Sequence, residues 1–257
     1  MWTTCRLTAK AEILAYLETD RLYAGYAIGD LEPGMWEQSA WAVAKKGEQI
    51  QALSLHFAGL SLPAFFLMGS TEGIEAILAG ERLPTPVYMT CRENDLAMTR
   101  QFYDWQEITP MWRMVLGDDR PTPGTQCMRL GPEHGEGLTA LYGEGNAAAF
   151  SVAQLESGVF YGILNGERVV AAAGTHLVSE TYGVGAIGNV YTDPAYRRRG
   201  YGGATVAAVA DELAQRGIGD IILNVSQSNH AAIRVYERLG FERYCPFLEG
   251  PASAKDE

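Results

Sequence analysis

Apolar runs with the spacing of β-strands fill the middle of the second half of the chain. Residues 160–178, FYGILNGERVVAAAGTHLV, contain two such runs, separated by Asn165 and Gly166. This pair tolerates the positive φ angles of a type I′ turn, so the segment is typical of a tight hairpin. A third apolar run, 182–191, ends before Asp193 and Pro194, because proline cannot donate to a strand ladder. The pattern therefore predicts three consecutive antiparallel strands.

Two helical patterns follow these strands and enclose one more apolar run. The apolar positions of the first are spaced i, i+3, i+4 and i+7, at Val206, Val209, Ala210 and Leu213. Residues 221–225, IILNV, predict a short buried strand, and a second helix begins at Asn229 and ends at Gly240. We therefore predict an α/β (α+β) domain on a mixed, mostly antiparallel sheet flanked by helices.

The first half of the chain repeats this order more weakly. Its pattern predicts a hairpin that turns at Lys46 and Gly47, and then a strand, a helix, a strand and a helix between residues 64 and 105. We predict two domains, 1–120 and 127–249, with a boundary in the turn-forming segment 117–126 and a loose tail after Gly250. The first domain is either a second, similar α/β domain or a chance likeness.

Composition and charge restrict the functions open to this chain. The net charge of the 257 residues is -11 at pH 7, which is unfavourable for binding nucleic acid through phosphate contacts. No run approaches the ~18 apolar residues of a membrane span, and the N-terminus lacks the features of a signal peptide. The four cysteines are far apart, with no CxxC pair, so neither a metal site nor a disulfide is indicated. We expect a cytoplasmic protein without metal, nucleic-acid partner or membrane contact.

A cluster of arginines and glycines lies where the third strand should pass into the first helix. Arg197, Arg198 and Arg199 precede Gly200, Gly202 and Gly203 in the segment YRRRGYGG. A helix start presents free backbone N–H groups and partial positive charge, and residues without Cβ admit an anion to them. A Walker loop is absent, and the dinucleotide pattern GxGxxG fails because its third glycine is a threonine here. The segment predicts a site for a phosphate-bearing anion.

Two motifs give the second half a resemblance to the GNAT acetyltransferase superfamily. RRRGYG at 197–202 resembles the family's (R/Q)xxGx(G/A) signature, and NHAAIRVYERLGF at 229–241 resembles its NxxAxxxYxxxGF motif. The resemblance covers roughly residues 128–247 and implies a GNAT-like fold with acetyl-CoA as the acyl donor. The turn MGSTEG at 68–73 has neither the arginines nor the close glycines. A duplicated, degenerate first domain would therefore have lost its anion site.

The resemblance also implies roles for individual residues. Backbone amides of residues 198–203 would hold the pyrophosphate, and the backbone of 190–192 would pair with the pantetheine amides. A main-chain N–H near Val190 would stabilise the oxyanion, Asn229 would bond to the pantetheine arm, and Tyr236 would be the catalytic acid for the thiolate. The implied cofactor-binding residues are Val190, Tyr191, Thr192, Arg197, Arg198, Arg199, Gly200, Tyr201, Gly202, Gly203, Asn229 and Tyr236.

The general base that would deprotonate the amine stays open at this point. His176 lies on a strand that should approach the site, and Glu156, Glu180 and Asp193 are carboxylates within reach by topology. No motif surrounds any of them, and water could relay the proton instead. Asn189 either faces the acceptor or bonds across the strands.

Two functions are consistent with these features. The first is an acetyl-CoA-dependent N-acetyltransferase that acts on a primary amine of a small molecule, an amino acid or a protein by direct attack in a ternary complex. The alternative is a non-catalytic coenzyme A-binding sensor or regulatory protein. The acidic balance favours a cationic acceptor. The acceptor, the acyl chain length, the role of the first domain and the oligomeric state stay open, a homodimer among them.

Overall fold

The structure is a computed structural model that describes residues 1–80, 83–118, 121–122, 126–146 and 150–255. Its contacts group the chain into two compact units. Unit 1 contains Met1–Trp112, Ser226–Ser228 and the chain from Cys245 onward, and unit 2 contains Arg113–Val225 and Asn229–Tyr244. Part of the predicted domain boundary, 119–120 and 123–125, lies outside the described residues. The domain ranges 1–120 and 127–249 stay a prediction.

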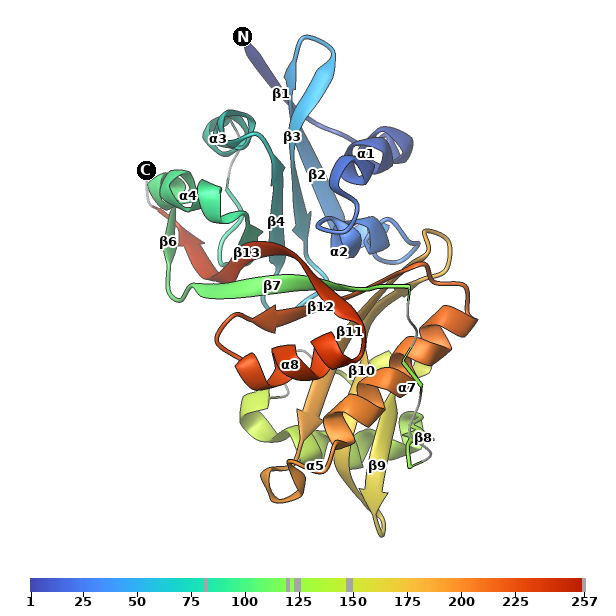
Figure 1. The fold of residues 1–257 in the computed structure, drawn as a ribbon. Coiled ribbons are helices and arrows are strands. Elements are labelled where there is room, and N and C mark those ends of the chain that lie inside the picture. Colours follow the sequence, from blue (N-terminus) through green and yellow to red (C-terminus); the bar gives the residue numbers. More distant parts are fainter. Residues whose placement is uncertain (81–82, 119–120, 123–125, 147–149, 256–257) are drawn as a thin grey trace. The chain divides into compact units, whose positions relative to one another are not determined.

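Unit 1 is a mixed sheet with helices on it (Figure 1). Its strand order is β1, β2, β3, β4, β5, β13, and β6 also pairs with β13. Only the β4 and β5 pair is parallel among the register pairs described within this unit. Its elements are β1 (Trp2–Arg6), α1 (Lys10–Leu17), α2 (Gly25–Gly29), β2 (Ser39–Lys46), β3 (Gln49–Phe57), β4 (Ala64–Gly69), α3 (Thr71–Gly80), β5 (Val87–Cys91), α4 (Leu96–Phe102), β6 (Tyr103–Trp105) and the first half of β7 (Thr109–Leu116).

Unit 2 has the same arrangement of elements. Its strand order is β13, β7, β12, β11, β10, β9, β8, and the β11 and β12 pair is parallel. The predicted mixed, mostly antiparallel sheet is confirmed in both units. The elements of unit 2 are β8 (Met128–Arg129), α5 (Gly135–Asn146), α6 (Gln154–Ser157), β9 (Tyr161–Asn165), β10 (Arg168–Ser179), β11 (Val184–Thr192), α7 (Tyr201–Gln215), β12 (Asp220–Ser226), α8 (His230–Arg238) and the start of β13 (Phe241–Ala254).

The predicted hairpin of unit 2 turns where its sequence indicates. Gly166 has a φ of 63°, and Asn165 lies opposite Arg168 as the strands separate from the turn. The hairpin of unit 1 turns in the same way at Gly47, whose φ is 64°. Glycine adopts a positive φ without a steric penalty, so both turns follow from local sequence alone.

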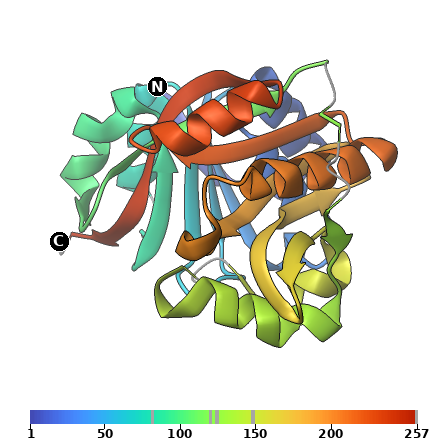
Figure 2. The same ribbon diagram turned by 60° about the horizontal axis from the view of Figure 1, so that its bottom comes forward.

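Helices cover both faces of the unit 2 sheet, with α7 on one face and α5 on the other (Figure 2). All four stripe residues of α7 are fully buried, which confirms the predicted packing face. Neighbouring residues of β10 point to opposite faces: Val169 packs in the cluster around Leu138 of α5, and Val170 packs beside Ala204 of α7. The apolar run of β10 is therefore continuous because both faces of the strand are covered.

The last strand corrects the expected loose tail. Residues up to Ala254 belong to β13, in which Gly250 pairs with Met89 of β5 and Ala254 pairs with Tyr103 of β6. Ala252 is fully buried. The segment PASA looked loose because its partners lie some 150 positions earlier in the chain, and non-local pairing overrides local propensity.

Two general properties complete the fold. All four cysteines are free thiols. Among the described residues, no helix combines the length and the apolar character that a membrane crossing requires.

Candidate functional site

Strands β11 and β12 start as a parallel pair and then lose their pairing. Their register ends at Ile187 and Leu223, whereas β11 continues to Thr192 and stays paired with β10 over that length. Beyond Ile187, the edge of β11 that faces away from β10 has no pairing with β12 in the described structure. Such an edge presents N–H and C=O groups to which an extended ligand can add as a further strand.

A bulge in β11 lies just beyond this point. Asn189 and Val190 of β11 lie opposite the single residue Ala173 of β10, and Asn189 has a φ of 51°. The hydroxyl of Tyr142 donates to the Asn189 carbonyl oxygen at 2.7 Å, and the Asn189 side-chain amide donates to Gln154 Oε1 at 3.4 Å. Bulges redirect the strand that carries them and are frequent next to active sites. This bulge therefore sets the course of the next three residues, 190–192.

The chain leaves β11 through the predicted stop and a short 3₁₀ turn, Pro194–Tyr196. The carboxylate of Asp193 accepts from the Ala195 N–H at 2.8 Å and so fixes the start of this turn. Arg198 has a φ of 63° and Gly200 a φ of 80°, so the backbone enters the left-handed region twice before α7 begins. Left-handed residues in a turn help to direct successive N–H groups to one side, as anion-binding nests require.

The backbone N–H groups of residues 198–203 form the candidate anion site. Within the described part of the chain, none of them donates to a backbone acceptor, whereas the next N–H, that of Ala204, donates to the Gly200 carbonyl oxygen at 3.0 Å. The free donors lie at the start of a 15-residue helix, where the helix dipole adds partial positive charge. An anion is the natural complement of this arrangement.

Two glycines of the first α7 turn bring three elements together. A Cβ added at Gly202 would lie 3.4 Å from Thr192 Oγ1, at the end of β11. A Cβ added at Gly203 would lie 3.3 Å from Val235 Cγ1, on α8. The end of β11, the start of α7 and the middle of α8 are therefore in contact, as the predicted site requires.

The arginines before the glycines are exposed and supply positive charge. Arg197 Nε donates to the Thr192 carbonyl oxygen at 3.1 Å, and its guanidinium lies 5.8 Å from the centroid of the Tyr191 ring. The Arg199 guanidinium lies 5.2 Å from the centroid of the Tyr196 ring. Arg197 thus braces the turn against β11, and cation–π contacts hold two of the three guanidinium groups against neighbouring tyrosine rings.

Helix α8 supplies the other two predicted residues. Asn229 is its N-cap, because Asn229 Oδ1 accepts from the Ala232 N–H at 3.1 Å, which leaves the Nδ2 amide as a donor for a ligand. Tyr236 is 7% exposed and packs against Phe241, with 6.1 Å between the ring centroids. Burial raises the pKa of the Tyr236 phenol to about 12, so it stays protonated at neutral pH. Among the described residues its hydroxyl has no hydrogen-bond partner.

His176 lies beside the open end of the β11 and β12 pair. It is the extra residue of a bulge in β10, and a Cβ added at Gly188 would meet its ring at 2.2 Å, so the ring covers that glycine. The residue keeps contact with solvent on one side, and its ring bonds to the Asn189 side chain. Protein atoms packed around the ring desolvate it and lower the pKa of His176, against the opposing effect of that bond, so the ring is neutral at pH 7. A neutral imidazole is the form that accepts a proton.

The three carboxylates considered as bases are placed differently. Glu180 pairs with Arg216 at 3.7 Å, beyond the C-terminal end of α7, and 15 helical residues span about 22 Å, so the expectation that Glu180 lies within reach is wrong. Asp193 pairs with Arg168 and caps the 3₁₀ turn, so its oxygens are already used. Glu156 is exposed on α6.

Asn224 is a polar residue that the sequence analysis did not single out. It follows Leu223 on β12, at the point where pairing with β11 ends. Its Oδ1 is buried and has no hydrogen-bond partner among the described residues, which is costly unless a ligand donor reaches it. The signal was present in the sequence, because Asn224 is the polar position within the apolar run IILNV.

The corresponding turn of unit 1 is closed. Only Ser70 separates β4 from α3, and its N–H donates to the Gln51 carbonyl oxygen at 2.9 Å. The Gly73 N–H donates to Ser70 Oγ at 3.2 Å, so the serine caps the helix start where α7 has free N–H groups. A Cβ at Gly69 would lie 2.3 Å from the same Gln51 oxygen, which shows how closely the turn approaches β3.

Comparisons with known proteins agree with this description. Residues 130–241 match the acetyltransferase (GNAT) family. The [ribosomal protein bS18]-alanine N-acetyltransferase of Escherichia coli (strain K12) is 40% identical over 72 residues, 26% of this chain and 49% of that protein. The mycothiol acetyltransferase of Kocuria rhizophila is 44% identical over 62 residues, 23% of this chain and 20% of that protein. The chain spans about half the length of the first of these relatives and less of the second.

A solved structure extends the likeness to the whole chain. A tandem GNAT protein from the clavulanic acid biosynthesis pathway superposes with a TM-score of 0.59 at 14% identity, covering 100% of both chains. At this identity the likeness concerns the fold alone. It agrees with the two similar units, including the GNAT-like order of elements in the first.

Proposed function

We propose that this protein transfers the acetyl group of acetyl-CoA to a primary amine, because residues 130–241 match the acetyltransferase (GNAT) family. One observation carries the proposal: the β11 edge becomes free beyond Ile187 and leads directly to the free N–H groups of 198–203. An open strand edge that ends in an anion site suits an extended amide-containing arm with a pyrophosphate at one end.

The described residues fit acetyl-CoA at three points. The N–H groups of 198–203 would hold the pyrophosphate, with added charge from the neighbouring guanidinium groups. The free edge at Val190–Thr192 would pair with the amides of the pantetheine arm, and Asn229 Nδ2 would donate to the same arm. Acetyl-CoA supplies the acetyl group as a reactive thioester.

The chain's own groups would control charge and protons during direct attack of the amine in a ternary complex. The backbone N–H near Val190 would donate to the carbonyl oxygen as negative charge develops there. The Tyr236 hydroxyl is protonated and has no hydrogen-bond partner among the described residues, and it would give its proton to the departing sulfur. The incoming amine must be neutral when it attacks. Its nitrogen then carries an extra proton, which must be removed for the amide product to form.

For that proton we propose His176, directly or through water. It is neutral at pH 7, accessible to solvent and bonded to the Asn189 side chain in the bulge next to the free edge. Asn224 Oδ1, which has no hydrogen-bond partner among the described residues, would accept a hydrogen bond from the acceptor amine. This bond would turn the lone pair of the amine nitrogen toward the acetyl group.

The acceptor class follows from charge and from the relatives. One relative is named as an N-acetyltransferase for an alanine of a ribosomal protein, and the other is named as a mycothiol acetyltransferase. The net charge of -11 favours the approach of a cation, which an amine is at pH 7. We therefore propose a primary amine of a small molecule, an amino acid or a protein, in the cytoplasm.

Two measurements test this function. Calorimetry with acetyl-CoA measures binding, and release of free thiol over a panel of amines, amino acids and N-terminal peptides measures transfer. We expect binding together with thiol release that depends on the acceptor. Binding without release from any acceptor would favour the coenzyme A sensor instead, and absence of binding would overturn both functions.

A further inference from the structure

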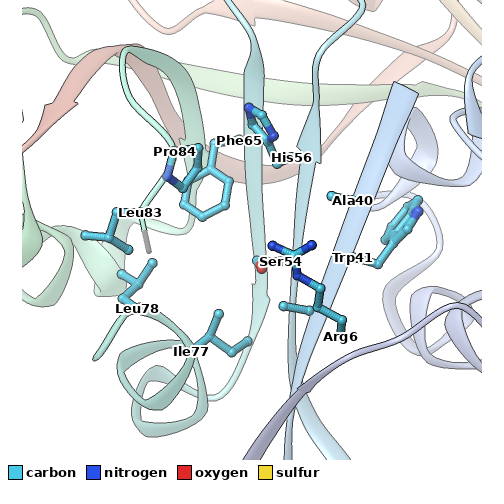
Figure 3. Close-up of a pocket in the computed structure, with 11 residues that line it drawn as sticks. Arg6, Ala40, Trp41, Ser54, His56, Phe65, Ile77, Leu78, Leu83 and Pro84 are labelled. Atoms are coloured by element: carbon cyan, nitrogen blue, oxygen red, sulfur yellow. The ribbon is translucent and has the colours of Figure 1, made fainter. Parts of the chain in front are cut away.

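A small pocket of unit 1 has no part in the proposed acetyl transfer. It has a volume of about 90 Å³ and lies on the face of β1–β4 that α3 covers (Figure 3). A single water needs about 10–15 Å³ by this measure, so the pocket has room for a small organic molecule. Its residues are all in unit 1.

The floor of the pocket is recessed because two alanines of β2 lie between larger polar residues of β1 and β3. Arg6, Ala42 and Ser54 are register neighbours across β1, β2 and β3 and therefore share one face. Ala40 is the register neighbour of His56 in the next row. The methyl groups of the alanines leave space between the side chains of β1 and β3, and Figure 3 shows Arg6 extending across β2 toward Ser54.

The polar groups of the floor are donors, and the Ser54 hydroxyl has no hydrogen-bond partner among the residues that the structure describes. Ser54 is 4% exposed, and its hydroxyl makes no hydrogen bond to any described residue. Arg6 brings a permanent positive charge. Desolvation lowers the pKa of His56, so its ring is neutral and offers one N–H donor at pH 7. No carboxylate among the described residues lines the pocket.

The walls restrict the ligand further. Phe65 of β4 and Ile77 and Leu78 of α3 make the remaining surface apolar. Ile77 and Leu78 belong to the last turn of α3, where the helix dipole places partial negative charge. This end of a helix repels anions, and it repels a doubly charged ion more strongly than a singly charged one. A single negative charge on an apolar body suits both the donors and the walls.

We propose that this pocket binds a small monocarboxylate with a branched or compact apolar body. Its carboxylate would accept from the Arg6 guanidinium, the Ser54 hydroxyl and the His56 ring, and its apolar part would contact the end of α3. The site belongs to unit 1 and does not depend on the acetyl-CoA site proposed for unit 2.

Isobutyrate is a suitable probe, with isobutyramide as its uncharged counterpart and inorganic phosphate as a more highly charged anion. NMR of the four histidine rings in the full chain, with the His56 signal identified by its loss in His56→Gln, reports binding directly. We expect isobutyrate to shift the His56 signal in a saturable way, and the other two probes to leave it unchanged. An equal response to isobutyramide, or a stronger one to phosphate, would overturn the proposal, as would no response to isobutyrate.

Variants test the geometry. Arg6→Gln should weaken isobutyrate binding at least ~10-fold, because a charge-assisted hydrogen bond is lost. Ala40→Leu, at an exposed position of β2, should abolish binding by filling the hollow. Arg100→Gln, an exposed arginine of the same unit that does not line the pocket, should bind like the unchanged protein. Thermal unfolding of each variant shows that it is folded, and unchanged binding in a folded Ala40→Leu variant would refute the site.

Discussion

Gly202 lies in the first turn of α7, within the candidate anion site. The nearest atom to an added Cβ is Thr192 Oγ1 at 3.4 Å, which is an ordinary contact. A side chain is therefore sterically tolerated there, and what it carries determines the effect on the anion site.

We expect Gly202→Glu to weaken acetyl-CoA binding at least ~100-fold, because its carboxylate would take the place of the phosphate and repel it. A glutamate in the first turn of a helix interacts favourably with the helix dipole. The substitution should therefore not lower the melting temperature through this interaction. Calorimetry measures the affinity, and Gly202→Ala is the matched control with a Cβ and no charge. Near-normal affinity in Gly202→Glu would show that the anion site lies elsewhere.

Burial raises the pKa of Tyr236 to about 12, so its hydroxyl is protonated at neutral pH and is available as a donor to the departing sulfur. Removal of the hydroxyl in Tyr236→Phe should lower kcat about 100-fold and leave the affinity for acetyl-CoA within about 2-fold, since the ring and its packing on Phe241 remain. Steady-state kinetics and calorimetry separate the two effects. Unchanged kcat would remove Tyr236 from the role of acid.

His176 leads to a prediction about pH. Desolvation places its pKa below the ordinary value of 6.5, and the neutral form is the base, so activity should fall as pH decreases through that lowered pKa and not before. His176→Gln should lower kcat about 100-fold and remove this acid limb from the pH profile, while His230→Gln, at an exposed position on α8, should change neither. An unaltered acid limb in His176→Gln would leave water as the base.

Among the elements, the long strand β13 is the one whose final structure differs most from what its local sequence predicts. Its first residues, Phe241–Tyr244, belong to unit 2, and the rest pairs with β5 and β6 in unit 1. Strand β7 is divided in the same way between Trp112 and Arg113. Each unit thus contains a strand segment that comes from the other half of the sequence.

Removal of residues 250–257 should destabilise the protein, because the pairing of Gly250–Ala254 with β5 and β6 and the burial of Ala252 are lost. A cost of about 2–3 kcal/mol corresponds to a decrease in melting temperature of about 5–10 °C for a chain of this size. Arg100→Gln in the full chain, at an exposed position of the same unit, is the control and should leave the melting temperature unchanged. Equal melting temperatures for the truncation and this control would contradict the role of the strand end.

For the whole molecule, the two units have similar folds and different helix starts. Unit 2 leaves the N–H groups of 198–203 free, whereas Ser70 caps the helix start of unit 1 and binds to Gln51. We therefore expect one acetyl-CoA per chain. Calorimetric titration should give a stoichiometry near one, and Gly202→Glu should remove this binding. A stoichiometry of two would show that the closed turn of unit 1 opens to admit a second molecule.

Local sequence determined much of this protein. The hairpin at Gly166, the buried stripe of α7 and the N-cap at Asn229 all follow from spacing, turn chemistry and capping, which act over a few residues. The motif around Gly202 predicts an anion site in the same way, and that site stays a prediction. These features could be predicted because the interactions that define them lie within one turn or one helix.

The tertiary structure alone decided the features that join distant residues. The end of pairing at Ile187 and Leu223, the partner that occupies Glu180 and the unpaired oxygen of Asn224 depend on how separate strands and helices meet. The pairing of β13 with β5 and the hollow beside Arg6 arise in the same way, from residues far apart in sequence. Non-local packing sets which backbone edges stay free and which side chains find partners, and no pattern along the chain contains that information.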